Sequence, residues 1–209
     1  MKKESLKEKN NLFVYIMLFF ALAFIGWCFE VLNEIRKGHG FINRGVLHGP
    51  WLPIYGFGGL IIYILLKKFY KKPIIVFSLS FLISAVIEYA TSFYLEITKG
   101  MVWWDYSKKP FNINGRICFL YTLVFALLAT ILYYFVIPKI IDLLKKVNYK
   151  TLSVISIILL SLYLVDNIYS YKKPNIAFHG GNKVDLNIVA KMNEFAGFLK
   201  LLRKLDENN

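Results

Sequence analysis

The sequence has few charged residues and almost no cysteine. Only 19% of its 209 residues are charged and two are cysteines, whereas 57% are hydrophobic. A chain this rich in hydrophobic residues is not intrinsically disordered, and two cysteines cannot build a disulfide-stapled fold. A mean hydropathy of +0.50 is also too high for an ordinary soluble domain. These shortages point to a membrane protein.

Motifs of nucleotide-dependent and metal-dependent enzymes are missing as well. The sequence contains no GxxxxGK[ST] phosphate loop, no HExxH and no CxxC. The histidines are too dispersed to predict a metal site, so we predict no metal and no cofactor, and a non-enzyme more readily than an enzyme. Cys28 and Cys118 both fall near predicted helix ends, which allows a disulfide, although two buried thiols are the preferred interpretation.

Long apolar runs are what the sequence does have. About 20 helical residues cross the hydrocarbon core of a bilayer. Five segments meet or approach that length, namely 10–29, 53–69, 73–95, 117–138 and 151–165. The first is too long for the apolar part of a signal peptide, so we expect it to be retained. No ten-residue alternation suggests a barrel, which leaves helices as the spanning structure.

The predicted fold class is therefore all-α, a polytopic transmembrane helix bundle of about five spans. Residues 1–10 are predicted to be a cytoplasmic N-terminal segment and 11–171 the five-helix transmembrane domain. Residues 172–209 are predicted to be a polar tail with an interfacial or docking helix, because apolar residues recur there at helical spacing among charged ones.

The positive charge is arranged as a topology signal. Lys and Arg outnumber Asp and Glu by 26 to 13. Twelve basic residues fall in the N-terminal stretch and the connections 67–72 and 139–150, against seven in the two longer connections on the other side. The positive-inside rule then predicts a cytoplasmic N-terminus. Because the basic residues are scattered over loops, we predict no nucleic-acid partner.

Costly polar residues gather at the predicted non-cytoplasmic helix ends. Four carboxylates there face two arginines: Glu30, Glu88, Glu96 and Asp166 against Arg44 and Arg116. At least two acids thus lack a guanidinium partner and must be protonated, hydrated or matched by a cation. Glu88 is the strongest functional candidate, because it lies well inside its span. The alternative is a structural carboxylate paired with one of the two arginines.

A broken segment precedes the second predicted span. The stretch 45–59, GVLHGPWLPIYGFGG, holds seven Gly or Pro residues, which makes regular helix unfavourable before Tyr55. Non-helical backbone at membrane depth must be covered by protein or line a cavity, and it often marks a binding site. A re-entrant segment and a plain loop that enters the second helix at Pro53 are both open interpretations.

The next long connection contains WWDYS at 103–107 and FNINGR at 111–116. Asp105 and Arg116 flank an Asn- and Gly-rich turn, where they can meet over a cavity. Trp104 is either a cavity residue or an interfacial anchor. The complete set of candidate cavity residues is Glu30, Asn43, Arg44, His48, Tyr55, Glu88, Ser92, Glu96, Trp104, Asp105, Asn112, Arg116 and Asp166.

Several blocks of sequence resemble a bacterial family named for ABC-transporter permeases of the CmpB type. They are GWCFEV at 26–31, NRGVLHGPWLPIYGFG at 43–58, EYATSFYLE at 88–96, WWDYS and FNINGRIC within 103–118, and DNIYS at 166–170. The resemblance implies a multi-pass permease of the bacterial cytoplasmic (inner) membrane, embedded in the lipid bilayer. It also implies a separate ATP-binding subunit, and it leaves a homo-oligomer open. Such a subunit needs a cytoplasmic segment of the permease to bind, which is called a coupling element. Only 140–147 could serve, because the connection 67–72 is too short.

Three functions remain in view from the sequence. The first is a membrane transport component with a carboxylate- and arginine-lined cavity at the non-cytoplasmic face, whose substrate is unknown. The second is an outer-leaflet enzyme acting on a lipid or cell-envelope precursor, with a carboxylate base and two arginines holding an anionic group. The third is a non-catalytic membrane assembly protein.

Overall fold

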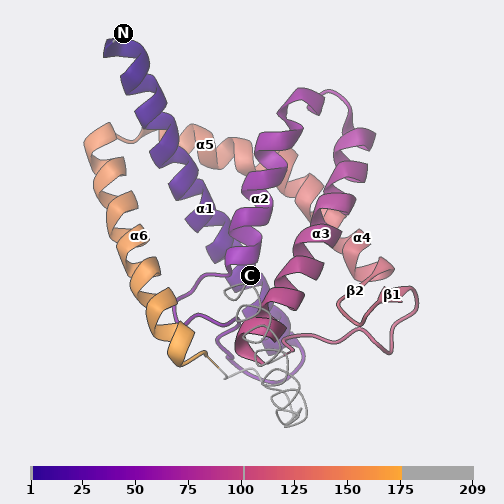
Figure 1. Ribbon diagram of the computed structural model, residues 1–209. Helices are drawn as coiled ribbons and strands as arrows, with labels where there is room; N and C mark the ends of the chain where they lie inside the picture. Colours follow the sequence, from indigo (N-terminus) through magenta and orange to yellow (C-terminus); the bar gives the residue numbers. More distant parts are fainter. Residues whose placement is uncertain (1, 101, 176–209) are drawn as a thin grey trace, which may run out of the picture.

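The protein is a bundle of helices with one small hairpin. The computed structural model describes residues 2–100 and 102–175, and of residues 2–11 only the backbone (Figure 1). The helices are α1 (Lys2–Arg36), α2 (Pro53–Leu66), α3 (Pro73–Lys99), α4 (Phe119–Ile131), α5 (Ile137–Lys146) and α6 (Tyr149–Lys172). The two-stranded antiparallel hairpin, which the sequence did not predict, pairs β1 (Asn112–Ile113) with β2 (Ile117–Cys118).

Four helices are long and apolar enough to cross a membrane: Leu12–Arg36, Pro73–Lys99, Phe119–Lys146 and Tyr149–Lys172. The count of about five spans is not confirmed, because α2 has only 14 residues. Such a helix rises about 21 Å, short of a hydrocarbon core of about 30 Å. The predicted interfacial helix of the tail lies outside the described residues, which end at Asn175.

The third of these spans is a continuous helix with a wide turn inside it. A π-helical turn, η2 (Leu132–Val136), joins α4 to α5, and Pro138 lies in the first turn of α5. Proline has no backbone N–H to donate, which favours an irregular turn just before it. In Figure 1 the combined helix runs behind α3 and α2, from the hairpin toward α1.

The short length of α2 follows from where it begins. After α1 ends, residues 37–52 fold back along it without forming a helix, and the N–H of Leu52 donates to the carbonyl of Ala23 at 3.1 Å. Ala23 lies roughly 20 Å back from the end of α1. Helix α2 then starts at Pro53, beside the middle of α1. We call residues 37–52 the re-entrant segment, for their path back along α1.

Glycines let α2 lie close against α1. A Cβ atom at Gly56 would come within 2.6 Å of the Phe19 ring and 2.9 Å of the Phe19 carbonyl oxygen. On α1 itself, a Cβ at Gly26 would overlap the Tyr55 side chain. The expectation that regular helix is unfavourable before Tyr55 was wrong by two residues, since α2 starts at Pro53, where proline fits the first turn of a helix.

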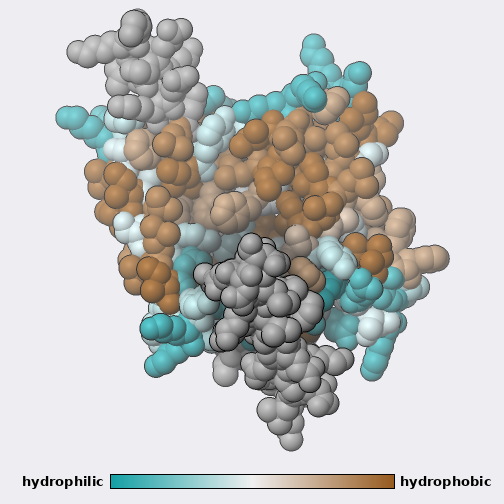
Figure 2. All heavy atoms as spheres, in the orientation of Figure 1, coloured by the Kyte–Doolittle hydropathy of each residue, from teal (hydrophilic) through white to brown (hydrophobic). Residues whose placement is uncertain are grey.

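Large apolar side chains face outward along the helices. Exposed examples are Leu82 and Val86 on α3, Leu127 on α4, and Val165 and Ile168 on α6. Figure 2 shows the resulting apolar band between hydrophilic ends. A soluble protein would bury such surface, whereas a bilayer covers it. Two buried clusters hold the bundle together, one centred on Leu18 and Ile137 and the other on Ile62 and Tyr133.

The two ends of the bundle differ. At one, the basic end, the connections are short: η1 (Lys67–Phe69) with 70–72 joins α2 to α3, and 147–148 joins α5 to α6. At the other, the loop end, lie the re-entrant segment, the hairpin and the last turn of α6 (Figure 1). All of the candidate site residues except Tyr55 and Glu88 lie on these loops or in the last turns beside them.

Candidate functional site

Glu30, near the end of α1, has one partner within the re-entrant segment and another in the first turn of α2. It accepts a hydrogen bond from the Tyr55 hydroxyl at 2.7 Å and another from Arg44 Nη2 at 3.2 Å. Both charged side chains are largely shielded from solvent, with 19% of Glu30 and 16% of Arg44 exposed. The ion pair fixes the middle of the re-entrant segment to α1, and Tyr55 fixes the start of α2 to the same carboxylate.

Glu88, on α3, has no arginine partner among the described residues. Only 4% of it is exposed, and its Oε2 atom accepts no hydrogen bond from any residue in the described part of the chain. The Tyr106 hydroxyl is hydrogen-bonded to the carboxylate. A buried carboxylate oxygen that no described residue satisfies is expensive, so it must take up a proton, a water molecule or a cation.

Tyr106 reaches Glu88 from the long connection between α3 and α4. Burial raises the pKa of its hydroxyl, and the neighbouring Glu88 carboxylate raises that pKa further. The hydroxyl is therefore protonated at neutral pH and donates. Glu30, Glu88, Tyr55 and Tyr106 interact electrostatically with one another. We call these four residues the carboxylate–tyrosine site.

The connection that carries Tyr106 is held by its own polar residues. The Tyr106 N–H donates to the Gly115 carbonyl at 2.7 Å. Asp105 accepts hydrogen bonds from the N–H and the hydroxyl of Ser107, at 2.8 and 2.9 Å. Asn112 caps the same turn, since it donates to the Ser107 carbonyl and accepts from the Gly115 N–H. Asp105 and Asn112 thus shape the loop.

The expected contact between Asp105 and Arg116 is not formed, because each has a nearer partner. Arg116 makes an ion pair with Glu96 on α3 and donates to the Ser92 hydroxyl at 3.2 Å. Its guanidinium also lies over the rings of Tyr89 and Phe93. The Arg116 carbonyl accepts from the Trp104 indole at 2.8 Å. This group ties the start of α4 to the last turns of α3.

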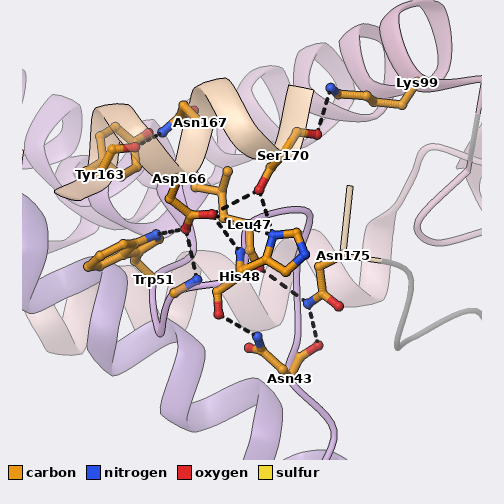
Figure 3. A network of polar contacts seen from close by, with 11 residues as sticks. Asn43, Leu47, His48, Trp51, Lys99, Tyr163, Asp166, Asn167, Ser170 and Asn175 are labelled. Atoms are coloured by element: carbon orange, nitrogen blue, oxygen red, sulfur yellow. Dashed lines mark hydrogen bonds and ion pairs between the residues drawn. The ribbon is translucent and has the colours of Figure 1, made fainter. Parts of the chain in front are cut away.

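Asp166, on α6, is saturated by donors (Figure 3). Its Oδ1 atom accepts from the His48 N–H at 3.0 Å and from the Ser170 hydroxyl at 2.9 Å. Its Oδ2 atom accepts from the Gly49 N–H and the Trp51 indole, both at 2.8 Å. Four donors stabilise the charged form, so Asp166 needs no arginine.

Amide side chains complete the anchoring of the re-entrant segment. Asn43 accepts from the Trp27 indole at 2.7 Å and donates to the His48 carbonyl at 2.8 Å. Asn175 donates to the carbonyls of Asn43 and Leu47 (Figure 3). The His48 ring lies 2.9 Å from the Ser170 hydroxyl. We call this group the Asp166 clasp; it consists of Asn43, His48, Gly49, Trp51, Asp166, Ser170 and Asn175.

The structure therefore divides the predicted site residues into separate groups. Glu30 contacts Arg44 and Tyr55 and interacts electrostatically with Glu88. Arg116 gathers Ser92, Glu96 and Trp104 beside α3 and α4. Asn43 and His48 lie with Asp166 beside α6, while Asp105 and Asn112 stay within the loop of Tyr106. Tyr106 was not among the predicted site residues, although it lies inside the WWDYS motif. Nor was Glu34, which is fully buried and bonded to Lys37 and His39 at 2.8 and 2.7 Å.

Two further predictions concern metal and sulfur. Within the described residues, no three His, Cys, Asp or Glu side chains are grouped as metal ligands. Cys28 and Cys118 are both free thiols, so the disulfide alternative is wrong. Chemically, the carboxylate–tyrosine site offers acceptor oxygens and aromatic faces, which suit a cation or a proton.

The segment 140–147, which the sequence suggested as a coupling element for an ATP-binding subunit, has most of its apolar side chains packed inside the bundle. Ile141 is buried in the core cluster around Leu18, and Ile140 and Leu144 pack against that cluster. Of the five apolar residues in this stretch, Leu143 is the most exposed, at 64%.

The comparison with known families covers the region that holds these groups, apart from Asn175. No curated protein and no solved structure matches the chain. One family model matches residues 17–171, which include α2, α3, α4, both long connections and Asp166. The matched stretch is well over half of the 209 residues. The chain belongs to the family described as "Putative ABC-transporter type IV".

Proposed function

We propose that the protein is the membrane-spanning component of a transporter and that its carboxylate–tyrosine site binds a cationic group of the transported solute. The observation that carries the proposal is Glu88, whose buried carboxylate has one oxygen without a partner among the described residues. Glu30 adds a second carboxylate, while Arg44 supplies one compensating charge. The site therefore keeps a deficit of positive charge that a cation would fill.

The position of the site supports transport. It lies where a short helix, α2, begins beside the middle of α1 after a non-helical segment. Interrupted helices of this kind commonly form the binding sites of transporters, because they expose backbone polar groups at membrane depth. The family description supports the same role, and it implies a separate ATP-binding subunit.

An outer-leaflet enzyme is less well supported. That function would use Arg44 and Arg116 to hold a phosphate or carboxylate of the substrate. Both arginines are instead in ion pairs, with Glu30 and Glu96. Releasing either one would leave a partly buried carboxylate unpaired, which is costly.

Substitution of Glu88 tests the binding site. We expect choline, guanidinium or putrescine, used as cation probes on the purified full-length chain, to raise the melting temperature of the wild-type protein. Glu88→Gln removes the charge at constant shape and is expected to abolish that shift. The control is Asp142→Asn, which removes an exposed carboxylate at the basic end, away from this site, and should keep the shift. Equal shifts in wild type and Glu88→Gln, or no shift with any probe in wild type, would overturn the cation site.

Uptake measurements test the transport role separately. Cells lacking the gene should take up less of the cation that stabilises the purified protein, and affinity purification should recover an ATP-binding subunit. Unchanged uptake together with no recovered ATP-binding subunit would reject an ABC transporter.

A further inference from the structure

A second site lies at the basic end, far along the bundle from the carboxylate–tyrosine site. A pocket of about 310 Å³ opens there between α2, η2 and α5. Its lining combines two lysines with three tyrosine rings and one carboxylate: Lys67, Lys145, Tyr63, Tyr70, Tyr133 and Asp142. We propose that this pocket binds a phosphate group, presented by the headgroup of an anionic membrane lipid.

The two lysines supply charge at the mouth of the pocket. The Lys67 ammonium donates one hydrogen bond to the Tyr15 hydroxyl at 2.8 Å and lies 4.6 Å from the centre of the Tyr63 ring. An ammonium has three donors, so two remain for an anion. No ion pair joins Lys145 to any carboxylate in the described part of the chain. With Asp142 counted, the lining keeps a formal charge of +1, which favours a single anion.

The tyrosines form a rigid wall, and the helix irregularity places it. The Tyr133 ring is 6.4 Å from Tyr63 and 6.0 Å from Tyr70, and its hydroxyl donates to the Leu66 carbonyl at 3.0 Å. Tyr133 lies in the π-helical turn η2, one turn before Pro138. Such turns are often found at functional sites, because they redirect side chains that a regular helix would place elsewhere.

The surroundings suggest a lipid as the source of the phosphate. The pocket opens beside the connection 67–72, which carries two further exposed lysines, Lys68 and Lys71. Exposed apolar residues of the membrane-facing band, such as Ile64 and Leu65 on α2, lie next to it along the chain. A lipid can place its acyl chains on this band while its headgroup enters the pocket. Basic pockets between helices are known to hold lipid headgroups in this way.

Lipid retention by matched variants tests the proposal. The full-length chain is incorporated into phosphatidylcholine nanodiscs with increasing phosphatidylglycerol, and bound lipid is counted by native mass spectrometry. Lys145→Gln and Lys67→Gln should each weaken phosphatidylglycerol retention about fivefold. The matched control, Lys146→Gln, removes a neighbouring charge that does not line the pocket and should retain the lipid as wild type does.

Two further experiments test whether the pocket attracts negative charge and whether the bound phosphate belongs to a lipid. Asp142→Asn removes the opposing charge and should tighten retention, the reverse of the lysine variants. Inorganic phosphate at millimolar concentration should leave the bound lipid in place if the headgroup is the source, whereas displacement would assign the same phosphate site to the free ion. Equal retention by Lys145→Gln and Lys146→Gln, or weaker retention by Asp142→Asn, would overturn the proposal.

Discussion

At the scale of single residues, two carboxylates with the same charge have opposite surroundings. Asp166 accepts four hydrogen bonds, two of them from backbone N–H groups. Glu88 is bonded to Tyr106 and keeps one buried oxygen unsatisfied within the described residues. Neither Asp166 nor Glu88 has an arginine partner in the described residues, so a count of arginines alone does not distinguish the two. From this difference in donors we propose that Asp166 has a structural role and that Glu88 is the better functional candidate.

Asp166→Asn tests the structural role of the clasp. The new amide keeps one acceptor oxygen and places an NH₂ group against two donors, so each donor left unpaired should cost about 1–3 kcal/mol. We expect a lower melting temperature and faster proteolysis within 43–52. Asp142→Asn, an exposed carboxylate at the other end, should change stability by less than about 0.5 kcal/mol. Equal stability of the two variants would contradict the clasp.

At the scale of elements, the start of α2 depends on close contact with α1. The re-entrant segment runs back along α1, so α2 begins beside the middle of α1 and is too short for a full span. Gly56 allows the two helices to approach closely. Gly and Pro composition predicted the break before α2. It did not predict how far along α1 the start of α2 would lie. That position is set by the hydrogen bond between Leu52 and Ala23 and by packing on α1.

A pair of glycine substitutions isolates that contact. Gly56→Ala forces a methyl group against Phe19 and should destabilise the protein by about 1–3 kcal/mol. Gly58→Ala is the matched control, because its Cβ would meet only Ile87, at 3.7 Å. It should be neutral or stabilising by about 0.5–1 kcal/mol, since alanine favours helix. Thermal unfolding in detergent measures both, and a neutral Gly56→Ala would contradict the close packing.

At the scale of the whole molecule, charge and polarity divide between the two ends. Short basic connections occupy one end and long, hydrogen-bonded loops occupy the other, with an exposed apolar band between them (Figure 2). The two proposed sites follow this division, with an acidic site near the loop end and a basic pocket at the basic end. By the positive-inside rule we expect the basic end to face the cytoplasm.

Cysteine labelling measures the orientation. In a chain with Cys28 and Cys118 replaced by alanine, Ser107→Cys should react with an impermeant maleimide added to intact cells, because Ser107 is exposed at the loop end. Lys150→Cys, exposed at the basic end, should react only after permeabilisation. The reverse pattern would place the N-terminus outside.

The sequence by itself determined the helical membrane class, the break before α2 and the distribution of basic residues, because hydropathy, glycine and proline content and charge are properties of local stretches of chain. Only the tertiary structure decided which acids are satisfied. The donors that surround Asp166 and the tyrosine that reaches Glu88 come from segments far away along the chain. Which carboxylate keeps an unsatisfied oxygen depends on how those segments pack.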